Sequence, residues 1–344
     1  MQNQIISKDL SIKDCLSKLD ELRGYTLFIV NDSNVLIGTV TDGDIRRALI
    51  SGLVLAEAAE KAMNADFSYL LKSDICYNSL NEFKKKKYRF LPVLNEDKTI
   101  DYILDLNNKR SYLPLDAVIM AGGQGTRLRP LTENTPKPLL KVGDKPIMEY
   151  NVDRLSLYGV KNLKISVNYL GEQLVDYFKD GSEKGMVIEY LKEDKPLGTL
   201  GSVVLTDNYV HDYILVMNSD LLTNVDFEDM FKVLKENDAD MIIASIPYEV
   251  NVPYAVMETT GKKVNSFVEK PTYTYYSNAG IYIFKKEHLH YIDRENPYQA
   301  TDLIQDLIND EKNVMTFPIL GYWLDVGKHE DFKKAQQDVE FINF

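Results

Sequence analysis

Hydrophobic and polar residues alternate in two different ways along the chain, and the change falls near residue 112. Before it, short apolar runs predict strands over residues 26–30, 35–40 and 90–94, and helix-like stretches cover residues 12–22, 44–50 and 80–87. A weaker copy of this order recurs between residues 72 and 106, which indicates an internal duplication. The pattern predicts a small α+β module over residues 1–112.

From residue 113 onward, apolar runs of strand length alternate with amphipathic stretches of helix length. The predicted strands cover residues 115–121, 163–167, 187–191, 213–217, 241–246, 279–284 and 314–317. Helices are expected to begin near Pro146, Leu170, Leu200, Phe227, Ala300 and Glu330. Strands that alternate with helices favour a mostly parallel sheet. The predicted fold class is therefore α/β, with a Rossmann-like domain over residues 113–344 whose sheet is mixed but mostly parallel.

Composition and charge narrow the function classes. The chain is 44% hydrophobic and 27% charged, as in ordinary globular proteins, and its apolar runs fall far short of the roughly 18 residues of a membrane span. A formal net charge of −12 argues against a nucleic-acid partner but leaves nucleotide substrates open. Cys15 and Cys76 form no CxxC pair, and Met1-Gln2-Asn3-Gln4 does not resemble a secretion signal. We therefore expect a cytoplasmic protein with no membrane partner.

One glycine-rich stretch is the most specific feature of the sequence. It reads Ala121-Gly122-Gly123-Gln124-Gly125-Thr126-Arg127-Leu128-Arg129-Pro130-Leu131-Thr132, followed by Thr135-Pro136-Lys137-Pro138-Leu139. Such a loop after a strand lets a triphosphate approach backbone N–H groups closely. A dinucleotide-binding fingerprint, and with it an oxidoreductase, would need a glycine in place of Leu128 and then a helix that Pro130 forbids. A P-loop would need Gly-Lys-Ser/Thr, which this stretch lacks.

Two cationic residues of this stretch suit phosphate chemistry. Arg127 can bond two phosphate oxygens at once and stabilise a departing pyrophosphate. Lys137 stands between two prolines, which we expect to hold the local backbone extended and its ammonium group in place. We expect Lys137 to contact the α-phosphate region.

Two aspartates more than a hundred residues apart predict a metal site. Asp220 follows the apolar strand 213–217, at the strand end where ligands of open α/β sheets bind. Asp325 follows a predicted turn at residues 321–324. Each alone is more often a cap or turn residue. Together with phosphate oxygens, their carboxylates would make a hard oxygen site suited to Mg²⁺.

The glycine-rich stretch and its Pro-Lys-Pro closely resemble the signature of the sugar-1-phosphate nucleotidyltransferases, G-G-x-G-T-R-L followed by P-K-P. The likeness continues through most of residues 115–340, in Asn168-Tyr169-Leu170, Leu197-Gly198-Thr199-Leu200-Gly201, Asn218-Ser219-Asp220, Val268-Glu269-Lys270-Pro271, Asn278-Ala279-Gly280 and Trp323-Leu324-Asp325-Val326-Gly327. The resemblance implies transfer of a nucleoside monophosphate from a triphosphate to a sugar 1-phosphate, with Mg²⁺ as cofactor and pyrophosphate as second product.

The same resemblance assigns a role to each candidate site residue. It assigns Arg127, Lys137 and Lys270 to catalysis, with Lys270 holding the attacking sugar phosphate. The implied nucleotide-binding residues are Ala121, Gly122, Gly123, Gly125, Thr126 and Gly198. The implied sugar-binding residues are Asn168, Gly201, Glu269 and Asn278, and the metal ligands are Asp220 and Asp325.

The expected base and sugar rest on the likeness of two short motifs to one branch of the family. The patterns at residues 168–170 and 197–201 look more like the guanylyl branch, as in mannose-1-phosphate guanylyltransferases, than the thymidylyl or cytidylyl branches. We therefore expect GTP, with a uridylyltransferase as the alternative. A catalytically silent subunit that only senses nucleotides is a rival of another class. The retained catalytic and metal residues speak against it.

The N-terminal module carries a second resemblance. Gly38-Thr39-Val40-Thr41-Asp42-Gly43-Asp44-Ile45-Arg46-Arg47-Ala48-Leu49 resembles the hallmark of a CBS motif. In that family two motifs pair, often bind adenine nucleotides and commonly dimerise, which implies a homo-oligomer and an adenine or guanine nucleotide effector. A CBS pair before such a catalytic domain resembles the glucosamine-1-phosphate guanylyltransferases of bacterial nonulosonate synthesis.

Thr41 and Asp44 are the candidate contacts for that effector. Asp44 near a helix N-terminus can accept bonds from ribose hydroxyls, while Thr41 and free N–H groups face phosphate. In the second copy we expect Leu104 in place of Thr41 and Asn107 in place of Asp44, so at most one site is well equipped. A purely structural or dimerising module that binds nothing stays open as the alternative.

Overall fold

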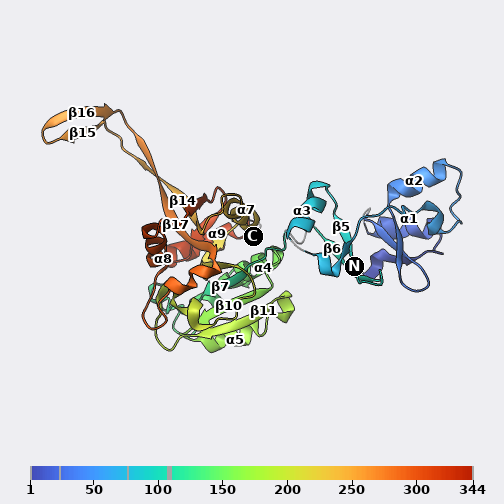
Figure 1. Cartoon of the computed structure of the whole chain (residues 1–344), viewed down its shortest axis with the longest axis horizontal. Coiled ribbons are helices and arrows are strands. Elements are labelled where there is room, and N and C mark those ends of the chain that lie inside the picture. Colours follow the sequence, from blue (N-terminus) through green and yellow to red (C-terminus); the bar gives the residue numbers. More distant parts are fainter. Residues whose placement is uncertain (1, 23–24, 76, 107–110, 343–344) are drawn as a thin grey trace. The chain divides into compact units, whose positions relative to one another are not determined.

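The chain divides into two units, Met1–Tyr112 and Leu113–Phe344 (Figure 1). The structure is a computed structural model, and it describes residues 2–22, 25–75, 77–106 and 111–342. None of the helices in these described ranges has the length and apolar character that crossing a bilayer requires.

The first unit repeats one arrangement twice. The first copy contains β1 (Ile5–Ser7), α1 (Ile12–Glu21), β2 (Leu27–Val30), β3 (Leu36–Val40) and α2 (Asp42–Ile50), and the second contains β4 (Leu70–Leu71), α3 (Tyr77–Lys85), β5 (Phe90–Leu94) and β6 (Ile100–Asp105). In each copy the first strand runs parallel to the central one and the last strand antiparallel to it. The internal duplication is therefore confirmed.

The two copies share a hydrophobic core. Phe28 and Leu36 of the first copy pack with Phe90, Leu94 and Ile103 of the second. The backbone N–H of Leu36 also donates to the carbonyl of Lys98, at 3.1 Å. The two copies therefore fold as one body. Cys15 is buried inside the first copy, and Cys76 lies outside the described residues.

Strand pairing corrects the register of the repeat by one residue. Leu27 pairs with Val40 in the first copy, and Leu91 pairs with Leu104 in the second, so Leu104 corresponds to Val40. Asp105, not Leu104, therefore stands in the place of Thr41. The sequence comparison missed this because it matched apolar runs, whereas the ladder fixes residue against residue. Asn107, which we expected opposite Asp44, lies outside the described residues.

Thr41 and Asp44 form a capping box at the start of α2. The Thr41 hydroxyl accepts from the N–H of Asp44 at 3.3 Å, and Asp44 Oδ2 accepts from the N–H and the hydroxyl of Thr41 at 2.9 and 2.6 Å. Arg47 donates to Asp44 Oδ1 at 2.6 Å. Both carboxylate oxygens of Asp44 thus serve the helix.

A seven-stranded sheet forms the centre of the second unit. Its order is β11 (Val187–Lys192), β10 (Asn162–Val167), β7 (Asp116–Met120), β12 (Tyr213–Asn218), β17 (Thr272–Lys285), β14 (Met241–Asn251) and β18 (Val314–Pro318). The first four strands are parallel, β17 is antiparallel to both neighbours, and β18 is parallel to β14. The expected α/β class with a mixed, mostly parallel sheet is confirmed.

Helices and three small strand pairs complete this unit. The helices are α4 (Ile147–Leu157), α5 (Gly171–Phe178), α6 (Gly198–Gly201), α7 (Phe227–Glu236), α8 (Ala300–Asn309) and α9 (His329–Asp338), and each begins within two residues of the expected start. The strand pairs are β8 (Lys141–Val142) with β9 (Lys145–Pro146), β13 (Leu221–Thr223) with β19 (Trp323–Asp325), and β15 (Val256–Thr260) with β16 (Lys263–Val268). In α7, Asp226 caps the first turn, and Phe227, Met230 and Leu234 form a buried stripe.

The core explains why these strands are readable from sequence. Val118 of β7 and Val216 of β12 are fully buried and pack with Leu303 and Leu307 of α8. Strands buried on both faces read as continuous apolar runs. The parallel strands β11, β10, β7 and β12 end at the same edge of the sheet, and this edge carries the site described below.

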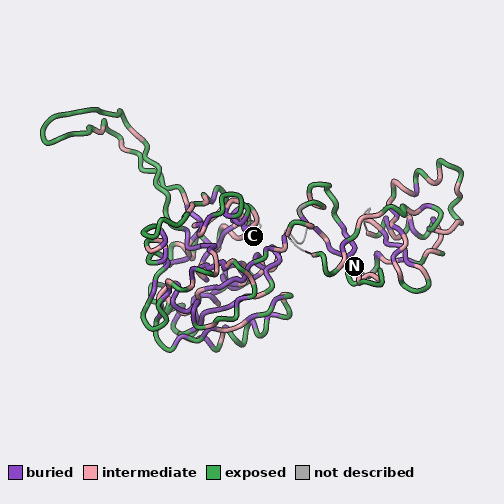
Figure 2. Tube along the Cα trace, viewed as in Figure 1, coloured by how far each residue is buried: buried purple, intermediate pink, exposed green. Residues whose placement is uncertain are grey.

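Two strands run far past the body of the sheet. The expected strands 241–246 and 279–284 extend to Asn251 and back to Thr272, and they carry the β15–β16 hairpin away from the body (Figure 1). Almost every residue of this projection is exposed (Figure 2). We call residues 246–277 the arm.

Candidate active site

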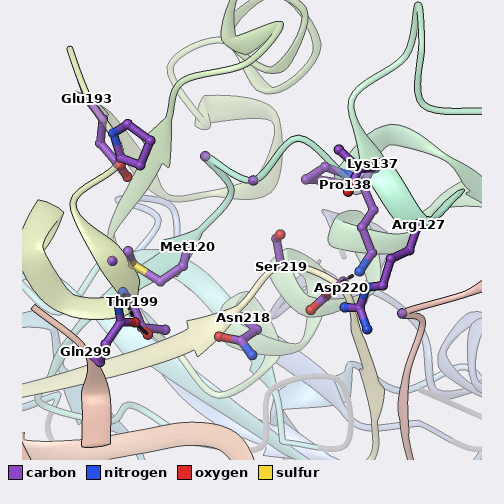
Figure 3. Close-up of a pocket in the computed structure, with 17 residues that line it drawn as sticks. Met120, Arg127, Lys137, Pro138, Glu193, Thr199, Asn218, Ser219, Asp220 and Gln299 are labelled. Carbon is purple, nitrogen blue, oxygen red and sulfur yellow. Dashed lines mark hydrogen bonds and ion pairs between the residues drawn. The ribbon is translucent and has the colours of Figure 1, made fainter. Parts of the chain in front are cut away.

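A pocket of about 460 Å³ opens at the carboxyl ends of β7, β11 and β12. Its walls come from residues 120–127, 137–138, 193–199 and 218–220, with Gln299 and Gly327. In Figure 3, Arg127, Lys137 and Asp220 lie at one end, and Glu193 and Gln299 lie at the other. A volume of this size suits a small organic ligand.

The glycine-rich loop brings bare backbone to the pocket. Gly122, Gly123, Gly125 and Thr126 all line it, directly after Ala121, whose N–H donates to the Ser166 carbonyl at 3.0 Å. Gly125 has a φ of +61°, and a Cβ there would lie 3.0 Å from Cβ of Lys137. Only glycine therefore fits at Gly125 without strain. A Cβ on Gly123 would meet no atom within 4 Å, so this residue borders open space.

Lys137 is held by a turn and by an ion pair. It opens a short 3₁₀ turn over Lys137–Leu139, in which the N–H of Leu139 donates to the Pro136 carbonyl at 2.9 Å. The expected extended backbone at Lys137 is therefore wrong, because only Pro136 is extended. The ammonium group donates to Asp220 Oδ2, and the Lys137 side chain is only 11% exposed. The lysine is thus fixed, but by a different backbone shape.

Asp325 reaches Asp220 through strand pairing. β13 follows Asp220 and pairs with β19, which places Asp325 opposite Leu221, and the N–H of Val326 donates to the Asp220 carbonyl at 3.0 Å. Asp325 ends this strand rather than following a turn. Burial, and then the charge of Asp220, raise the pKa of the Asp325 carboxyl to about 6, while Lys137 and Arg127 act in the opposite direction.

The two carboxylates fit a divalent cation. Oδ1 of Asp220 and Oδ1 of Asp325 are both buried, and neither has a hydrogen-bond partner among the described residues. Buried, unpartnered carboxylate oxygens are costly unless a cation or a donor satisfies them. A hard cation such as Mg²⁺, which keeps waters and takes phosphate oxygens, matches this donor set. The structure thus brings together the two predicted metal ligands.

Arg127 lies at the same end of the pocket. Its guanidinium lies against Gly327, where a Cβ would be 3.5 Å from both terminal nitrogens. Gly327 follows Asp325 by two residues, so the β19 strand positions both the carboxylate and the surface on which Arg127 rests. The predicted arginine, lysine and aspartates therefore converge.

The opposite end contains residues that sequence reasoning missed. Glu193 is buried; its carboxylate accepts from the Ser166 hydroxyl and, at 3.1 Å, from the N–H of Leu197. Gln299 accepts from the N–H and the hydroxyl of Thr199, at 3.1 and 2.7 Å. Because Glu193 comes directly after β11, the strand-end rule was a signal that could have found it. For Gln299, a hundred residues from Thr199, the sequence gives no signal.

Gly198 and Gly201 have different surroundings. Gly198 lines the pocket with a φ of +78°, and a Cβ there would lie 2.7 Å from the Tyr298 carbonyl oxygen. Gly201 is buried, and its close neighbour is Leu197, 2.8 Å from where a Cβ would lie. Gly201 therefore serves helix packing and does not reach the pocket.

The other predicted sugar residues lie outside the pocket lining. Asn168 is adjacent, since its side-chain amide donates to the Glu193 carbonyl at 2.8 Å. Asn278 is exposed at the base of the arm, where its Oδ1 accepts from the N–H of Gly280 at 2.9 Å. Glu269 and Lys270 lie on the arm itself and are exposed. The structure does not bring these two to the pocket of their own chain.

Comparison with known proteins agrees with this site. The nucleotidyl transferase family profile matches residues 116–341, and the CBS domain profile matches residues 4–51. The chain belongs to the nucleotidyl transferase family, and it carries a CBS domain at its N-terminal end.

Similar proteins indicate which branch of the family this chain resembles. The chain is 34% identical over 226 residues to a mannose-1-phosphate guanyltransferase of Yarrowia lipolytica, which covers 63% of this chain and 62% of that relative. It is 32% identical over 228 residues to a mannose-1-phosphate guanylyltransferase catalytic subunit beta of Danio rerio, with the same coverage. The chain thus spans less than two thirds of the length of these relatives.

A solved structure shares the fold. A protein assigned as a glucose-1-phosphate thymidylyltransferase from Bacillus anthracis superimposes with a TM-score of 0.55 at 24% identity. The match covers 67% of this chain and 97% of that one. At this identity the likeness concerns the fold of the second unit.

Asp325→Asn is expected to stabilise the metal-free protein at high pH. Because the folded-state pKa of about 6 exceeds the ordinary 3.8, ionising Asp325 costs folding free energy; the cost grows between these values and is complete above them. The variant should therefore melt a few degrees above the wild type at pH 8 in chelator, at about 2–4 °C per kcal/mol.

Calorimetric melting curves at pH 8 and pH 5 check this expectation. The difference between variant and wild type should narrow at pH 5, and added Mg²⁺ should raise the melting temperature of the wild type alone. Equal melting temperatures at pH 8 would contradict the cost assigned to the buried carboxylate.

Proposed function

We propose that this chain transfers a nucleoside monophosphate from a nucleoside triphosphate, GTP first, to a sugar 1-phosphate of mannose or glucosamine type. The products are a nucleoside diphosphate sugar and pyrophosphate. The observation that carries the proposal is the Lys137–Asp220 ion pair beside Asp325, at one end of a pocket walled by a glycine loop.

The proposed reaction needs alignment and charge neutralisation. An oxygen of the sugar phosphate attacks the α-phosphorus, a new P–O bond forms, and the bond to pyrophosphate breaks. The attacking phosphate is already ionised near pH 7, so no side chain has to remove a proton. The chain's task is to hold two anions in line despite their repulsion.

Each cationic residue has a position suited to one part of this task. Arg127 beside Gly327 can bond the departing pyrophosphate through two nitrogens. Lys137, fixed against Asp220, can contact the α-phosphate. The N–H groups of the loop from Gly122 to Thr126 suit the triphosphate oxygens, since Gly123 borders open space.

We assign the metal position to Asp220 and Asp325 and the metal to Mg²⁺. Their two unpartnered buried oxygens support this assignment. When bound, Mg²⁺ supplies positive charge that offsets the phosphate oxygens.

Glu193 supports GTP as the nucleotide. It lies at the pocket end opposite the phosphate-binding cluster (Figure 3), where a base would lie. A carboxylate only accepts hydrogen bonds, and guanine presents two adjacent donors, N1–H and the 2-amino group. Uracil presents one N–H between two carbonyl oxygens, which a carboxylate repels. Similarity to proteins named guanylyltransferases supports the same choice over a uridylyltransferase.

Glu269 and Lys270 remain our candidates for binding the sugar 1-phosphate. Asn168 and Asn278 remain candidates for further contacts with the sugar. The types of Glu269 and Lys270 suit the task, since a carboxylate accepts from sugar hydroxyls and an ammonium pairs with phosphate. The convergence of Arg127, Lys137 and Asp220 in one pocket argues against a catalytically silent subunit.

Lys137→Ala and Asp220→Asn should each lower kcat by about 100- to 1000-fold, the usual cost of removing one group that stabilises transition-state charge. Pyrophosphate release, measured across four triphosphates and several hexose 1-phosphates with and without Mg²⁺, checks this. Lys179→Ala, which removes an exposed lysine paired only with Glu183, is the matched control and should leave kcat unchanged. A loss below about tenfold in both variants, with the fold intact, argues against these roles.

Glu193→Gln should reduce the preference for GTP over UTP. Replacing one acceptor by a donor removes a charged hydrogen bond worth about 1.5–3 kcal/mol, roughly 10- to 150-fold in kcat/KM for GTP. The measurement is the ratio of kcat/KM for the two triphosphates. Asp194→Asn, at the exposed neighbouring position, should preserve the ratio. An unchanged ratio in Glu193→Gln would remove Glu193 from base recognition.

We also propose that the first unit senses an adenine or guanine nucleotide at Thr41 and Asp44. The CBS profile match supports a nucleotide role, although the capping box already occupies both residues. Titrating AMP and GMP into the full chain by calorimetry should give saturable heat for one of them, lost in Asp44→Ala. Monophosphates are used so that binding in the triphosphate pocket of the second unit contributes little of the heat. No heat from either would leave Thr41 and Asp44 with the capping role alone.

A further inference from the structure

The arm leaves the body as a paired ribbon that is unbroken as far as the Asn251–Thr272 pair, and the β15–β16 hairpin beyond it is a separate two-stranded sheet. A register shift between Ile243 and Ser245 marks where it departs, and from there the ladder is continuous from the Ser245–Asn278 pair to the Asn251–Thr272 pair. At about 3.4 Å per residue these rungs alone span roughly 20 Å, before the β15–β16 hairpin begins. The ribbon therefore carries the hairpin away from the body of its own chain (Figure 1).

The arm exposes many apolar side chains. The exposed large hydrophobic residues on it are Tyr248, Val250, Tyr254, Met257, Val264, Phe267, Val268, Tyr273, Tyr275 and Tyr276. Tyr254 and Phe267 are 76% and 67% exposed. A lone two-stranded ribbon is marginally stable in water, and an apolar surface of this extent marks an interaction site. Another surface must therefore cover the arm.

Charge indicates what that surface is. The arm balances three glutamates against three lysines, whereas the whole chain carries −12. Two bodies of like charge repel each other, but a neutral arm can approach the second body freely. Leu320, the most exposed large hydrophobic residue in the described part of the chain, offers an apolar position on the second unit.

The pocket also lacks a group that the arm carries. Of the described residues that line the pocket, only Arg127 and Lys137 are cationic, and Lys137 is already paired with Asp220. A triphosphate and a sugar phosphate together bring more negative charge than these two residues and a bound Mg²⁺ offset. Lys270 is exposed on the arm with a φ of +44°, a left-handed conformation that is strained for a residue with a Cβ. Such strain recurs where a side chain must be aimed at a ligand.

We propose that the arm docks on a second copy of this chain and delivers Glu269 and Lys270 to that copy's pocket. The exchange is reciprocal, so two arms complete two sites in one symmetric dimer. This inference rests on the proposed function, because the sugar phosphate is the ligand that the delivered residues hold.

Mixed dimers test the delivery directly. Lys137→Ala damages the pocket and Lys270→Ala damages the arm, and each homodimer should lose at least tenfold in activity. Co-expression with two affinity tags and sequential purification yields the mixed dimer, which has one intact site of two and should recover about half of wild-type activity. The matched control pairs Lys137→Ala with Asp220→Asn; both damage the same pocket, so this mixed dimer should stay inactive.

A mixed dimer as inactive as its parents overturns the proposal, and so does full activity of the Lys270→Ala homodimer. The first result would mean that each chain completes its own site. The second would mean that the arm delivers nothing to catalysis.

Removing the arm gives a readout that does not depend on activity. Ile246 and Ser277 face each other in the ladder, so an Asn-Gly turn can join them in place of residues 247–276. This variant should dimerise far more weakly than the wild type, while Glu269→Ala combined with Lys270→Ala, which keeps the apolar arm, should dimerise as the wild type does. A wild type that sediments as a monomer, or an armless variant that dimerises as tightly as the wild type, overturns the arm as the interface. If the wild type releases no pyrophosphate with any substrate pair, the proposed function fails, and sedimentation still decides the role of the arm.

Discussion

The second unit is organised around one ammonium group and two carboxylates. Lys137 pairs with Asp220, and Asp325 lies beside them, so that burial and the charge of Asp220 raise the pKa of its carboxyl. Each aspartate has one buried oxygen without a hydrogen-bond partner among the described residues, and such oxygens destabilise a folded protein unless a cation or a donor satisfies them. The β13–β19 pairing fixes both aspartates, and a 3₁₀ turn fixes the lysine.

The glycines of the site differ in their relation to that cluster. Gly125 is a glycine because its φ is positive and Lys137 lies against it, whereas a Cβ on Gly327 would make only an ordinary contact with the Arg127 guanidinium. Gly123 has no such neighbour, so its lack of a side chain serves the open space in front of it. The same residue type therefore has two physical reasons within one pocket. One allows charged side chains to pack closely, and the other keeps the pocket wide enough for a ligand.

The sequence predicts those parts of the structure that burial determines. The strands of the sheet are buried on both faces, so their apolar runs located them, and Pro146 marked the start of a helix. Sequence reasoning also brought together Arg127, Lys137, Asp220 and Asp325, because each belongs to a motif. It failed where no burial signal exists. The first half of β17, from Thr272 to Ser277, is exposed, so no buried apolar run located it, although its tyrosines and threonines favour a strand.

Three smaller errors share one cause. The shape at Lys137, the register of Leu104 and the contacts of Gln299 are all decided by groups distant in sequence or by hydrogen-bond pairing. Local propensity cannot supply that information. Pro138 favours an extended residue before it, yet the hydrogen bond from Leu139 to Pro136 closes a turn instead. Tertiary pairing therefore corrected details without changing which residues meet.

The sequence motif that contains Glu269 and Lys270 and the position of these residues on the arm have to be reconciled. The types of Glu269 and Lys270 suit a sugar phosphate, and the pocket has too few cations to hold two phosphate substrates. Yet the ladder that runs to the Asn251–Thr272 pair carries both residues away from the body, and neither lines that pocket. A residue pair cannot serve a site of its own chain while the ribbon that carries it stays straight. The two facts agree only if the pocket served belongs to another molecule. The exposed aromatic side chains then have the same explanation, because the ribbon that carries Lys270 outward is stabilised by the body it reaches.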